Sequence, residues 1–378
     1  MNETTRATEC TTEPTLYLAF ELGKTSWKLG FSTGLGQNAR IRTMDAGELA
    51  VLRQEIDQAR RRFRLPEGAV IRSCYEAGRD GFWLHRYLTS LGFRNLVVDS
   101  ASIEVNRRAK RTKTDRLDVA KLLTMLIRYH HGEERVWSVV HVPSVEAEDM
   151  RHLQRQLYSL KVARTRHVNR IKGLLVSQGV DVPVHAGFLE SLAGVRMWDG
   201  SPLPPRLCAR VAREYAHLRS VEEEIEELEA ERDKVIETSG LPCVAQVRQL
   251  MKLKGIGPAS AWLFVMEFFA WREFRNRRQV GSLAGLTPTV YQSGEESHDQ
   301  GISKAGNRLV RAMAIEVAWG WLRYQPESEL ARWYYEVFGE GGKRRHKVGI
   351  VAMARKLLVA LWHYLERGEI PTGAELKA

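Results

Sequence analysis

Four carboxylates lie where they could act together on a phosphate. Glu21 interrupts the apolar run LAFELG, and Glu76 ends the run SCYEAG. Asp115 and Asp118 follow in KTDRLDVAKLL, where a spacing of three places both on one face of a helix. Converging carboxylates repel one another, so a divalent cation is their natural partner, and hard oxygen ligands select Mg²⁺ or Mn²⁺. Two such ions can stabilise both the attacking and the leaving oxygen of a phosphoryl transfer.

A dense run of cations surrounds the first of these aspartates. Beside an acidic metal pocket, such a run would hold a phosphate backbone over the metals; on a solvated helix it would have no special role. Any one of the acids, taken alone, could equally be a solvated turn residue or a helix-start acid that complements the helix dipole. The six cations within ten residues are Arg107, Arg108, Lys110, Arg111, Lys113 and Arg116.

A second group of candidate residues lies near the C-terminus. Ser293 precedes Gly294 in YQSGEES, which predicts an exposed hydroxyl in a loop. A serine attacks only when a base or a metal activates it, and most loop serines are structural. The turn LKGIGPASA resembles a helix-hairpin-helix, in which the two glycines let backbone N–H groups approach a phosphate. The further candidate phosphate-binding residues are Gly255, Gly257, Lys304 and Arg308.

The elements before residue 140 predict an α/β domain that could position the four acids. Three strand-type runs (15–22, 27–32 and 39–44) precede a helical pattern over 45–63. Strands at 69–76 and 96–100 enclose another helix, and helical spacing resumes after the cations. The order β-β-β-α-β-α-β-α is that of an RNase H-like domain, with a mixed sheet and helices on its faces. We assign this domain to residues 15–140 and expect 1–14, rich in Thr and Glu, to be a disordered tail.

The remaining chain predicts an all-α region in two parts. Residues 146–176 and about 205–237 show apolar stripes at helical spacing, the first helix basic and the second acidic. That contrast suits either a long helical hairpin or a dimerising coiled coil, here taken as residues 146–240. Arg166 and Arg170 on the basic face are candidate nucleic-acid contacts. Residues 245–378 predict a helical domain that contains the GIG turn and Ser293.

Composition limits the class of protein. The 378 residues carry 57 Lys+Arg against 46 Asp+Glu, a formal net charge of +11, which favours a polyanionic partner because each neutralised phosphate releases counterions. Four scattered cysteines indicate neither a zinc site nor a disulfide framework. No signal peptide and no apolar run of about 18 residues is visible. We therefore expect a protein with no membrane partner, located in the bacterial cytoplasm and associated with the nucleoid.

These motifs, in this order, resemble one family, the DEDD-type insertion-sequence transposases, also called bridge-RNA-guided serine recombinases. The resemblance covers about residues 15 to 330, and KTDRLD (113–118) and LAGLTPTVYQSG (283–294) are its strongest parts. It implies a RuvC-like N-terminal domain that binds Mg²⁺. One position departs from the family pattern, which usually has Asp where this chain has Glu21; glutamate still ligates Mg²⁺. The implied metal ligands are Glu21, Glu76, Asp115 and Asp118.

The resemblance also implies a mechanism and partners. Ser293 would attack a DNA phosphate and form a transient phosphoserine link, in one composite site with the metal pocket. A structured guide RNA, the bridge RNA, would pair with donor and target DNA, so base pairing would choose the sequence. The protein would act as a homodimer, or as a tetramer of two dimers.

Two other hypotheses stay open. In the first, the chain is a RuvC-type, metal-dependent, structure-selective nuclease that uses water as its nucleophile, and Ser293 is an ordinary loop residue. In the second, it is a non-catalytic nucleic-acid-binding dimer with an inactive RNase H-like domain. The nuclease hypothesis leaves the long helical segment and the C-terminal domain without a role.

Overall fold

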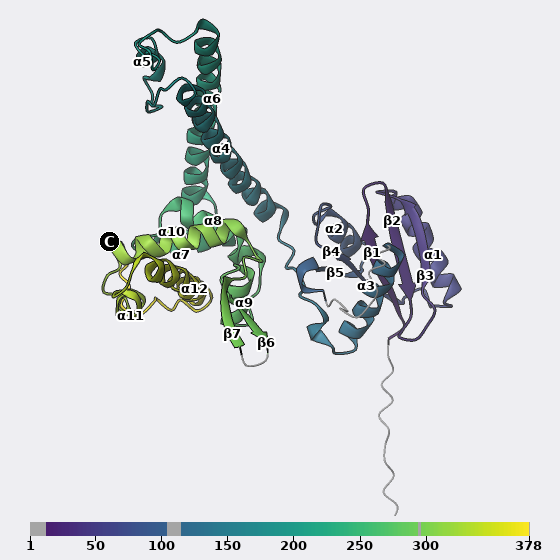
Figure 1. The fold of residues 1–378 in the computed structure, drawn as a ribbon. Helices are drawn as coiled ribbons and strands as arrows, with labels where there is room; N and C mark the ends of the chain where they lie inside the picture. The colour runs from purple at the N-terminus through teal and green to yellow at the C-terminus, as the bar shows by residue number, and fades with distance from the viewer. Residues whose placement is uncertain (1–12, 104–114, 294–295, 378) are drawn as a thin grey trace, which may run out of the picture. The chain divides into compact units, whose positions relative to one another are not determined.

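The chain folds into two compact units, residues up to Val142 and Pro143–Ala378. The computed structural model describes residues 13–103, 115–293 and 296–377. Figure 1 gives the helix and strand labels.

The N-terminal unit is built on a mixed five-stranded sheet. Its strands are β1 (Thr15–Leu22), β2 (Ser26–Ser32), β3 (Arg40–Asp45), β4 (Val70–Glu76) and β5 (Arg94–Val98). The spatial order is β3-β2-β1-β4-β5. The first three strands form an antiparallel meander, and β4 and β5 are parallel to β1. The strands predicted from the sequence are confirmed, with ends that differ by one or two residues.

Helices cover both faces of this sheet because its central strand is apolar on both sides. Leu16, Leu18 and Phe20 belong to the buried cluster that includes residues of α1 (Leu49–Arg62) and α2 (Trp83–Ser90). Tyr17 and Ala19 alternate with them and join the cluster of α3 (Asp115–His130). Successive side chains of a strand point to opposite faces. The short 3₁₀ turns η1 (Ser100–Ser102) and η2 (Glu134–Val136) precede and follow α3.

The second unit begins with a long helical hairpin. Helices α4 (Val145–Val176) and α6 (Pro205–Thr238) run side by side, and the short α5 (Phe188–Leu192) lies near their far end (Figure 1). Ser144 starts α4 by accepting a hydrogen bond from the backbone N–H of Ala147, as an N-cap serine does. A salt bridge of 2.6 Å joins Lys161 to Glu229 across the two helices. Of the two predicted arrangements, the structure therefore has the intramolecular hairpin.

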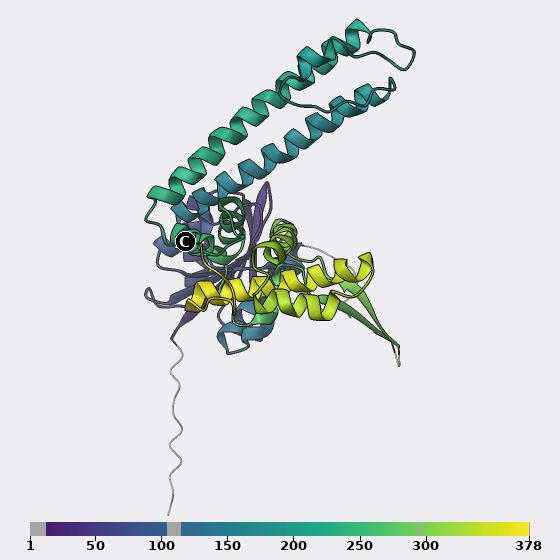
Figure 2. The same ribbon diagram turned by 90° about the vertical axis from the view of Figure 1, so that its left-hand side faces the viewer.

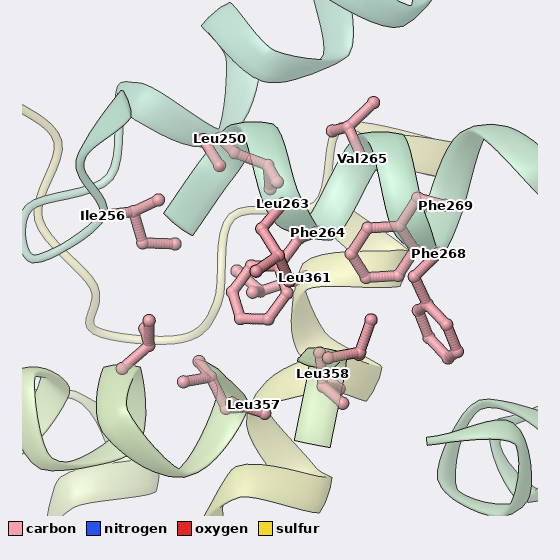
Figure 3. Packing of buried hydrophobic residues seen from close by; sticks show 14 of the residues in the cluster. Leu250, Ile256, Leu263, Phe264, Val265, Phe268, Phe269, Leu357, Leu358 and Leu361 are labelled. Carbon is pink, nitrogen blue, oxygen red and sulfur yellow. The ribbon is translucent and has the colours of Figure 1, made fainter. Parts of the chain in front are cut away.

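A mostly helical body completes the second unit. Its elements are α7 (Pro242–Met251), α8 (Pro258–Glu267), η3 (Phe269–Trp271), α9 (Arg277–Leu283), β6 (Pro288–Ser293), β7 (Glu296–Ile302), α10 (Arg308–Tyr324), α11 (Glu329–Phe338) and α12 (Lys343–Arg367). The core forms where Leu263 and Phe264 of α8 meet Leu357 and Leu361 of α12 (Figure 3). Figure 2 shows the hairpin β6–β7 projecting from these helices.

The β6–β7 hairpin corrects the prediction of an all-α region after residue 245. Its sequence, PTVYQS followed by ESHDQGI, is polar, so it resembles a loop when the sequence is scanned for buried strands. Among the described residues the two strands pair only with each other, so neither needs the apolar alternation of a strand that lies over a core.

Helix α12 bears on the expectation that the chain has no membrane span. By length and composition, Lys343–Arg367 could cross a membrane, and half of its most apolar window is buried inside the structure. Met353, Leu357 and Leu361 are at most 1% exposed and belong to the core of the second unit. The core helix of a globular unit has the same length and composition, and α12 packs as such a helix.

Candidate functional site

Glu21 lies on the face of the sheet that α3 covers. In β1, Tyr17 and Ala19 point toward α3, whereas Phe20 points to the opposite face. Because side chains alternate along a strand, Glu21 continues the row of Tyr17 and Ala19. It is half-buried at the end of β1, which explains how a charged group can follow five buried residues.

Glu76 lies next to Glu21 on the same face. The parallel register pairs Phe20 with Tyr75, so the residues that follow them occupy neighbouring positions on adjacent strands. Cys74, two residues before Glu76, is packed in the cluster of α3. Burial, with a smaller contribution from the negative charge of Glu76, raises the pKa of the Cys74 thiol far above its usual range. Burial therefore favours the neutral form of the Cys74 thiol, and the charge of Glu76 acts on it from nearby.

Asp118 approaches this face from α3. Its neighbour Val119 is fully buried, and a Cβ on Gly30 of β2 would lie 3.3 Å from its Cγ2 atom. The first turns of α3 therefore cross the sheet at β2, beside β1. Asp118 is half-buried there, and Asp115 is the first residue of the same helix.

The donor chemistry of this face fits Mg²⁺, because carboxylate oxygens are the ligands that the ion prefers. The side chain of Asp115 lies outside the part of the chain that the structure describes. The three described acids share a face, but they do not form a group whose ligand atoms all lie within 4.8 Å of one another. Among described residues, such a group lies elsewhere, at His167, Glu214 and His217.

Most of the basic run before α3 lies outside the residues that the structure describes. Arg107, Arg108, Lys110, Arg111 and Lys113 belong to residues 104–114, outside the described residues. Their assignment to a phosphate backbone stays a prediction.

Ser293 is the last residue of β6, and it pairs with Glu296 of β7 across the end of the hairpin. The prediction of a loop position is therefore corrected to a strand end next to the hairpin turn. Gly294, which follows it in the sequence, lies outside the described residues. Polar contacts hold the hairpin at its base: Thr289 Oγ1 donates to the carbonyl of Gly301 at 3.1 Å, and the Ser303 N–H donates to Thr287 at 2.9 Å.

Close backbone contacts anchor the base of this hairpin to α9 and α10. Gly285 has a φ of +69°, and Lys304 has a left-handed φ of 55°. A Cβ on Gly306 would lie 2.4 Å from the carbonyl oxygen of Leu283, so only glycine fits there. Arg311 donates to the carbonyls of Ala284 and Lys304 at 3.3 and 3.1 Å. The segments around AGL and KAGN thus hold the hairpin in place, while the side chains of Lys304 and Arg308 are exposed.

Glu267, a buried carboxylate that contacts Asn307 next to the base of the hairpin, is not among the residues predicted from the sequence. Glu267, at the end of α8, is 4% exposed and forms ion pairs with Arg151 and Arg155 of α4 at 3.1 and 3.4 Å. The side-chain amide of Asn307, which caps α10, donates to the backbone and carboxylate oxygens of Glu267 at 3.2 and 3.3 Å. The available signal was a lone acid at the end of the apolar run AWLFVME. Through these contacts, Glu267 connects α4 of the helical hairpin to Asn307, which lies shortly after β7.

The GIG turn, predicted to belong to a helix-hairpin-helix, connects α7 to α8. Gly255 has a φ of +85°, and Gly257 is the N-cap of α8. The N–H of Gly257 donates to Ser260 Oγ at 3.2 Å. C-terminal residues cover the turn, since the N–H of Lys254 donates to the carbonyl of Glu375 and Lys377 Nζ donates to that of Ile256. The turn is therefore already engaged by the chain itself, and its contact with phosphate stays a prediction.

On the helical hairpin, the two candidate cations differ. Arg166 is exposed, whereas Arg170 forms an ion pair with Glu214 of α6 at 2.8 Å. His167 lies 2.8 Å from the same carboxylate. Burial tends to raise the pKa of Glu214, but the hydrogen bonds from Arg170 and His167 outweigh it and lower the pKa. The group at His167, Glu214 and His217 is therefore explained as a link between α4 and α6.

The chain is similar in sequence to several known proteins. The model of the Transposase IS116/IS110/IS902 family matches residues 247–334. The chain is 40% identical over 375 residues to a protein of Sinorhizobium fredii named "Putative transposase y4rJ", covering 96% of this chain and 94% of the relative. It is 27% identical over 237 residues to the transposase for insertion sequence element IS1328 of Yersinia enterocolitica, covering 61% and 68%. It is also 27% identical over 229 residues to the transposase for IS1111A of Coxiella burnetii, covering 60% and 61%.

Proposed function

This chain belongs to the IS116/IS110/IS902 family of transposases, and from that premise we propose that it recombines DNA through a covalent link to Ser293. As a transposase of an insertion sequence, it is a DNA-processing enzyme and binds DNA. The proposal concerns the chemistry of that processing: which residues act and what guides them. The observation that carries it is the place of Ser293 at the end of a projecting hairpin with a rigidly packed base.

The proposed reaction exchanges one phosphate ester for another. The hydroxyl of Ser293 loses its proton, a bond forms between its Oγ and the phosphorus, and one P–O bond of the strand breaks, so that the leaving strand end takes up a proton. A hydroxyl of the incoming strand then attacks the same phosphorus, and Ser293 leaves and regains its proton. Each step makes one ester bond for every ester bond broken, so strands can be rejoined without ATP.

In the N-terminal unit, Glu21, Glu76, Asp115 and Asp118 would hold Mg²⁺ or Mn²⁺. The bound ion supplies positive charge that stabilises the phosphate in its transition state. Support comes from the shared face of Glu21, Glu76 and Asp118, and from a strand order and strand directions that suit an RNase H-like, RuvC-type domain.

The first experiment replaces Ser293 with Ala and, as a matched control, Ser297 of β7 with Ala. We expect Ser293→Ala to abolish the protein–DNA adduct seen on a denaturing gel and to lower recombination by about three orders of magnitude or more. The control variant Ser297→Ala should keep both the adduct and the recombination activity. Strand cleavage that persists in Ser293→Ala would instead identify a water-using nuclease.

Removal of the metal tests the acidic face. Chelation of divalent cations, or Asp118→Asn, should abolish strand cleavage while DNA binding persists. We expect Asp57→Asn, an exposed acid on α1, to behave as wild type. Cleavage that is fully active in Asp118→Asn would remove this face from the proposal, and no cleavage by the wild type under any metal would favour the non-catalytic binding protein.

We also propose that a structured guide RNA, encoded by the element, accompanies the protein as a homodimer or a tetramer of two dimers. The net charge of +11 supports a partner with many phosphates. The protein is expressed with its native flanking DNA and purified, and its bound nucleic acid is sequenced. One discrete transcript from the flank is the expected result, whereas random cellular fragments would contradict guidance.

A further inference from the structure

A cavity of about 1400 Å³ lies in the second unit, beside the base of the β6–β7 hairpin. Its walls come from the start of α9, both ends of the hairpin base, α11 and α12. Pro288, Gly301 and Ile302 connect it directly to the two strands that lead to Ser293. Of the candidate site residues predicted from the sequence that the structure describes, Lys304 alone is in the lining of this cavity.

The lining is strongly cationic. Seven of the nineteen lining residues are Lys or Arg, and among these nineteen described residues none is Asp or Glu. They come from α9, the segment after β7, and α12, so tertiary structure gathers them from separate parts of the chain. Like charges held together without acids cost free energy unless an anion offsets them. The charge therefore indicates a polyanionic ligand.

The start of α12 gives an independent sign of the same ligand. Its first five residues, KRRHK (343–347), include four Lys or Arg, its first turn has no acid, and no side chain caps it. Cations at a helix N-terminus oppose the helix dipole, and acids would stabilise it. Arg344 and Lys347 both line the cavity. The positive end of the α12 dipole thus adds to the positive charge of the Lys and Arg side chains. This favours binding of a phosphate, although it lowers the stability of the helix.

Much of the remaining lining of the cavity is apolar. Ten of the nineteen lining residues are apolar side chains, and one of them, Val348, is 57% exposed. Another of the ten is Trp333, and the Nζ atom of Lys356 lies 4.3 Å from its ring centroid. A duplex presents phosphates and sugars on its outside, whereas an unpaired strand also presents bases, which bind to apolar and aromatic surfaces.

We propose that this cavity binds an unpaired nucleic-acid strand, with its phosphates on the Lys and Arg side chains and its bases against the apolar residues of the lining. The inference rests on the proposed function in one respect, that such a strand leads to Ser293. From Pro288 to Ser293 the chain runs five residues along β6, or about 17 Å at ~3.3 Å per residue. The cavity would thus hold the strand a few nucleotides from the serine.

The test measures binding without chemistry. Fluorescence anisotropy in EDTA follows a labelled single-stranded DNA, a single-stranded RNA of the same sequence, and the corresponding DNA duplex on the full-length protein. The test variant is Lys347→Gln with Lys356→Gln, two exposed lysines of α12 that line the cavity. The matched control is Arg332→Gln with Arg367→Gln, which removes two exposed charges from α11 and α12 outside the lining.

We expect the test variant to weaken binding of the single strands and to lower the salt dependence, log K against log[salt], by about 1.4, which is two contacts at ~0.7 each. The control variant and duplex binding should change much less. Which single strand, DNA or RNA, loses more affinity identifies the source of the strand. An equal loss in test and control, or a loss confined to the duplex, would overturn the proposal.

A second variant separates binding from folding. Arg344→Glu puts an acid near the start of α12, where the dipole favours it, and reverses one charge of the cavity. We expect an unfolding midpoint equal to or above wild type, together with weaker single-strand binding; unchanged binding would count against the cavity. Full binding in these variants, with an adduct lost only in Ser293→Ala, would overturn the cavity and leave the proposed function intact. Weaker single-strand binding in these variants, with an adduct that persists in Ser293→Ala, would overturn the proposed function and leave the cavity intact.

Discussion

At the scale of single residues, Glu267 is a buried carboxylate whose contacts stabilise the hairpin that carries Ser293, although Glu267 is not itself a candidate site residue. A buried carboxylate is costly unless it is paired and hydrogen-bonded, and Glu267 is satisfied by two arginines of α4 and by Asn307. Because Asn307 also caps α10, directly after the segment that leaves β7, the carboxylate stabilises the base of the Ser293 hairpin.

We therefore predict that Glu267→Gln lowers the free energy of unfolding by roughly 2 to 3 kcal/mol, because Arg151 loses its charged partner in a partly buried place. Chemical denaturation of the second unit measures this. Arg155→Gln is the control: its side chain is 54% exposed, and we expect a loss below about 1 kcal/mol. Equal losses in the two variants would show that burial of Glu267 has no special importance.

At the scale of elements, glycines set the distances between the parts that carry the candidate residues. Gly30 lets α3 lie close to β2, which brings Asp118 toward the face with Glu21 and Glu76. Gly306 lets the segment after β7 contact the backbone of Leu283. Both glycines act through the packing of one element on another.

Gly30→Val is predicted to lower the free energy of unfolding by about 1 to 3 kcal/mol, because extra methyl groups would overpack the contact with Val119 and Leu123. If α3 is displaced, metal-dependent cleavage should fall as well. Thermal unfolding and a cleavage assay measure the two effects. Gly34→Ala, where a Cβ meets nothing within 4 Å, should leave both unchanged. Wild-type stability in Gly30→Val would contradict the packing argument.

Gly306→Ala is predicted to reduce the serine adduct strongly, because the new Cβ would collide with the carbonyl of Leu283 and shift the base of the hairpin. Gly320→Ala, in α10, has open space around it and should raise stability by up to about 1 kcal/mol through helix propensity. Adduct formation on a labelled DNA measures the first effect, and thermal unfolding the second. Normal adduct formation in Gly306→Ala would show that the close contact does not position Ser293.

At the scale of the whole molecule, the pH dependence of stability should follow from the N-terminal unit. Burial, with the charges of Arg72, Arg94 and His131, lowers the pKa of His130 to about 4. Arg72 Nη1 lies 2.5 Å from Nδ1 of His130, which suits a neutral imidazole that accepts a hydrogen bond. In the unfolded chain, His130 has its ordinary pKa near 6.5.

Between these two values the unfolded state binds more protons than the folded state, so stability rises with pH. The contribution of His130 is complete above about pH 6.5 and is lost as the pH falls toward 4. Unfolding of the N-terminal unit, followed from pH 7 to pH 4, should show this loss. His130→Asn keeps an acceptor for Arg72 but cannot gain a proton there, so its stability should fall less over the same range. Parallel curves for the two proteins would contradict the role of His130.

The sequence by itself determined the local elements and the chemistry of single residues. Alternating strands, helical spacing at 146–176 and the grouped acids and cations depend on neighbours a few residues apart, and the corresponding elements are confirmed in the structure. Even the shared face of Glu21 and Glu76 follows from alternation, once the two strands are paired.

Tertiary structure decided what depends on distant segments. In the part of the chain that the structure describes, the polar strands β6 and β7 pair only with each other, so they lack an apolar pattern, and the sequence predicts a loop at Ser293. Glu267 meets Arg151 across 116 residues, and the cavity gathers side chains from Arg277 to His363. Such contacts are set by the packing of whole helices, and spacing along the chain does not encode which helices will meet.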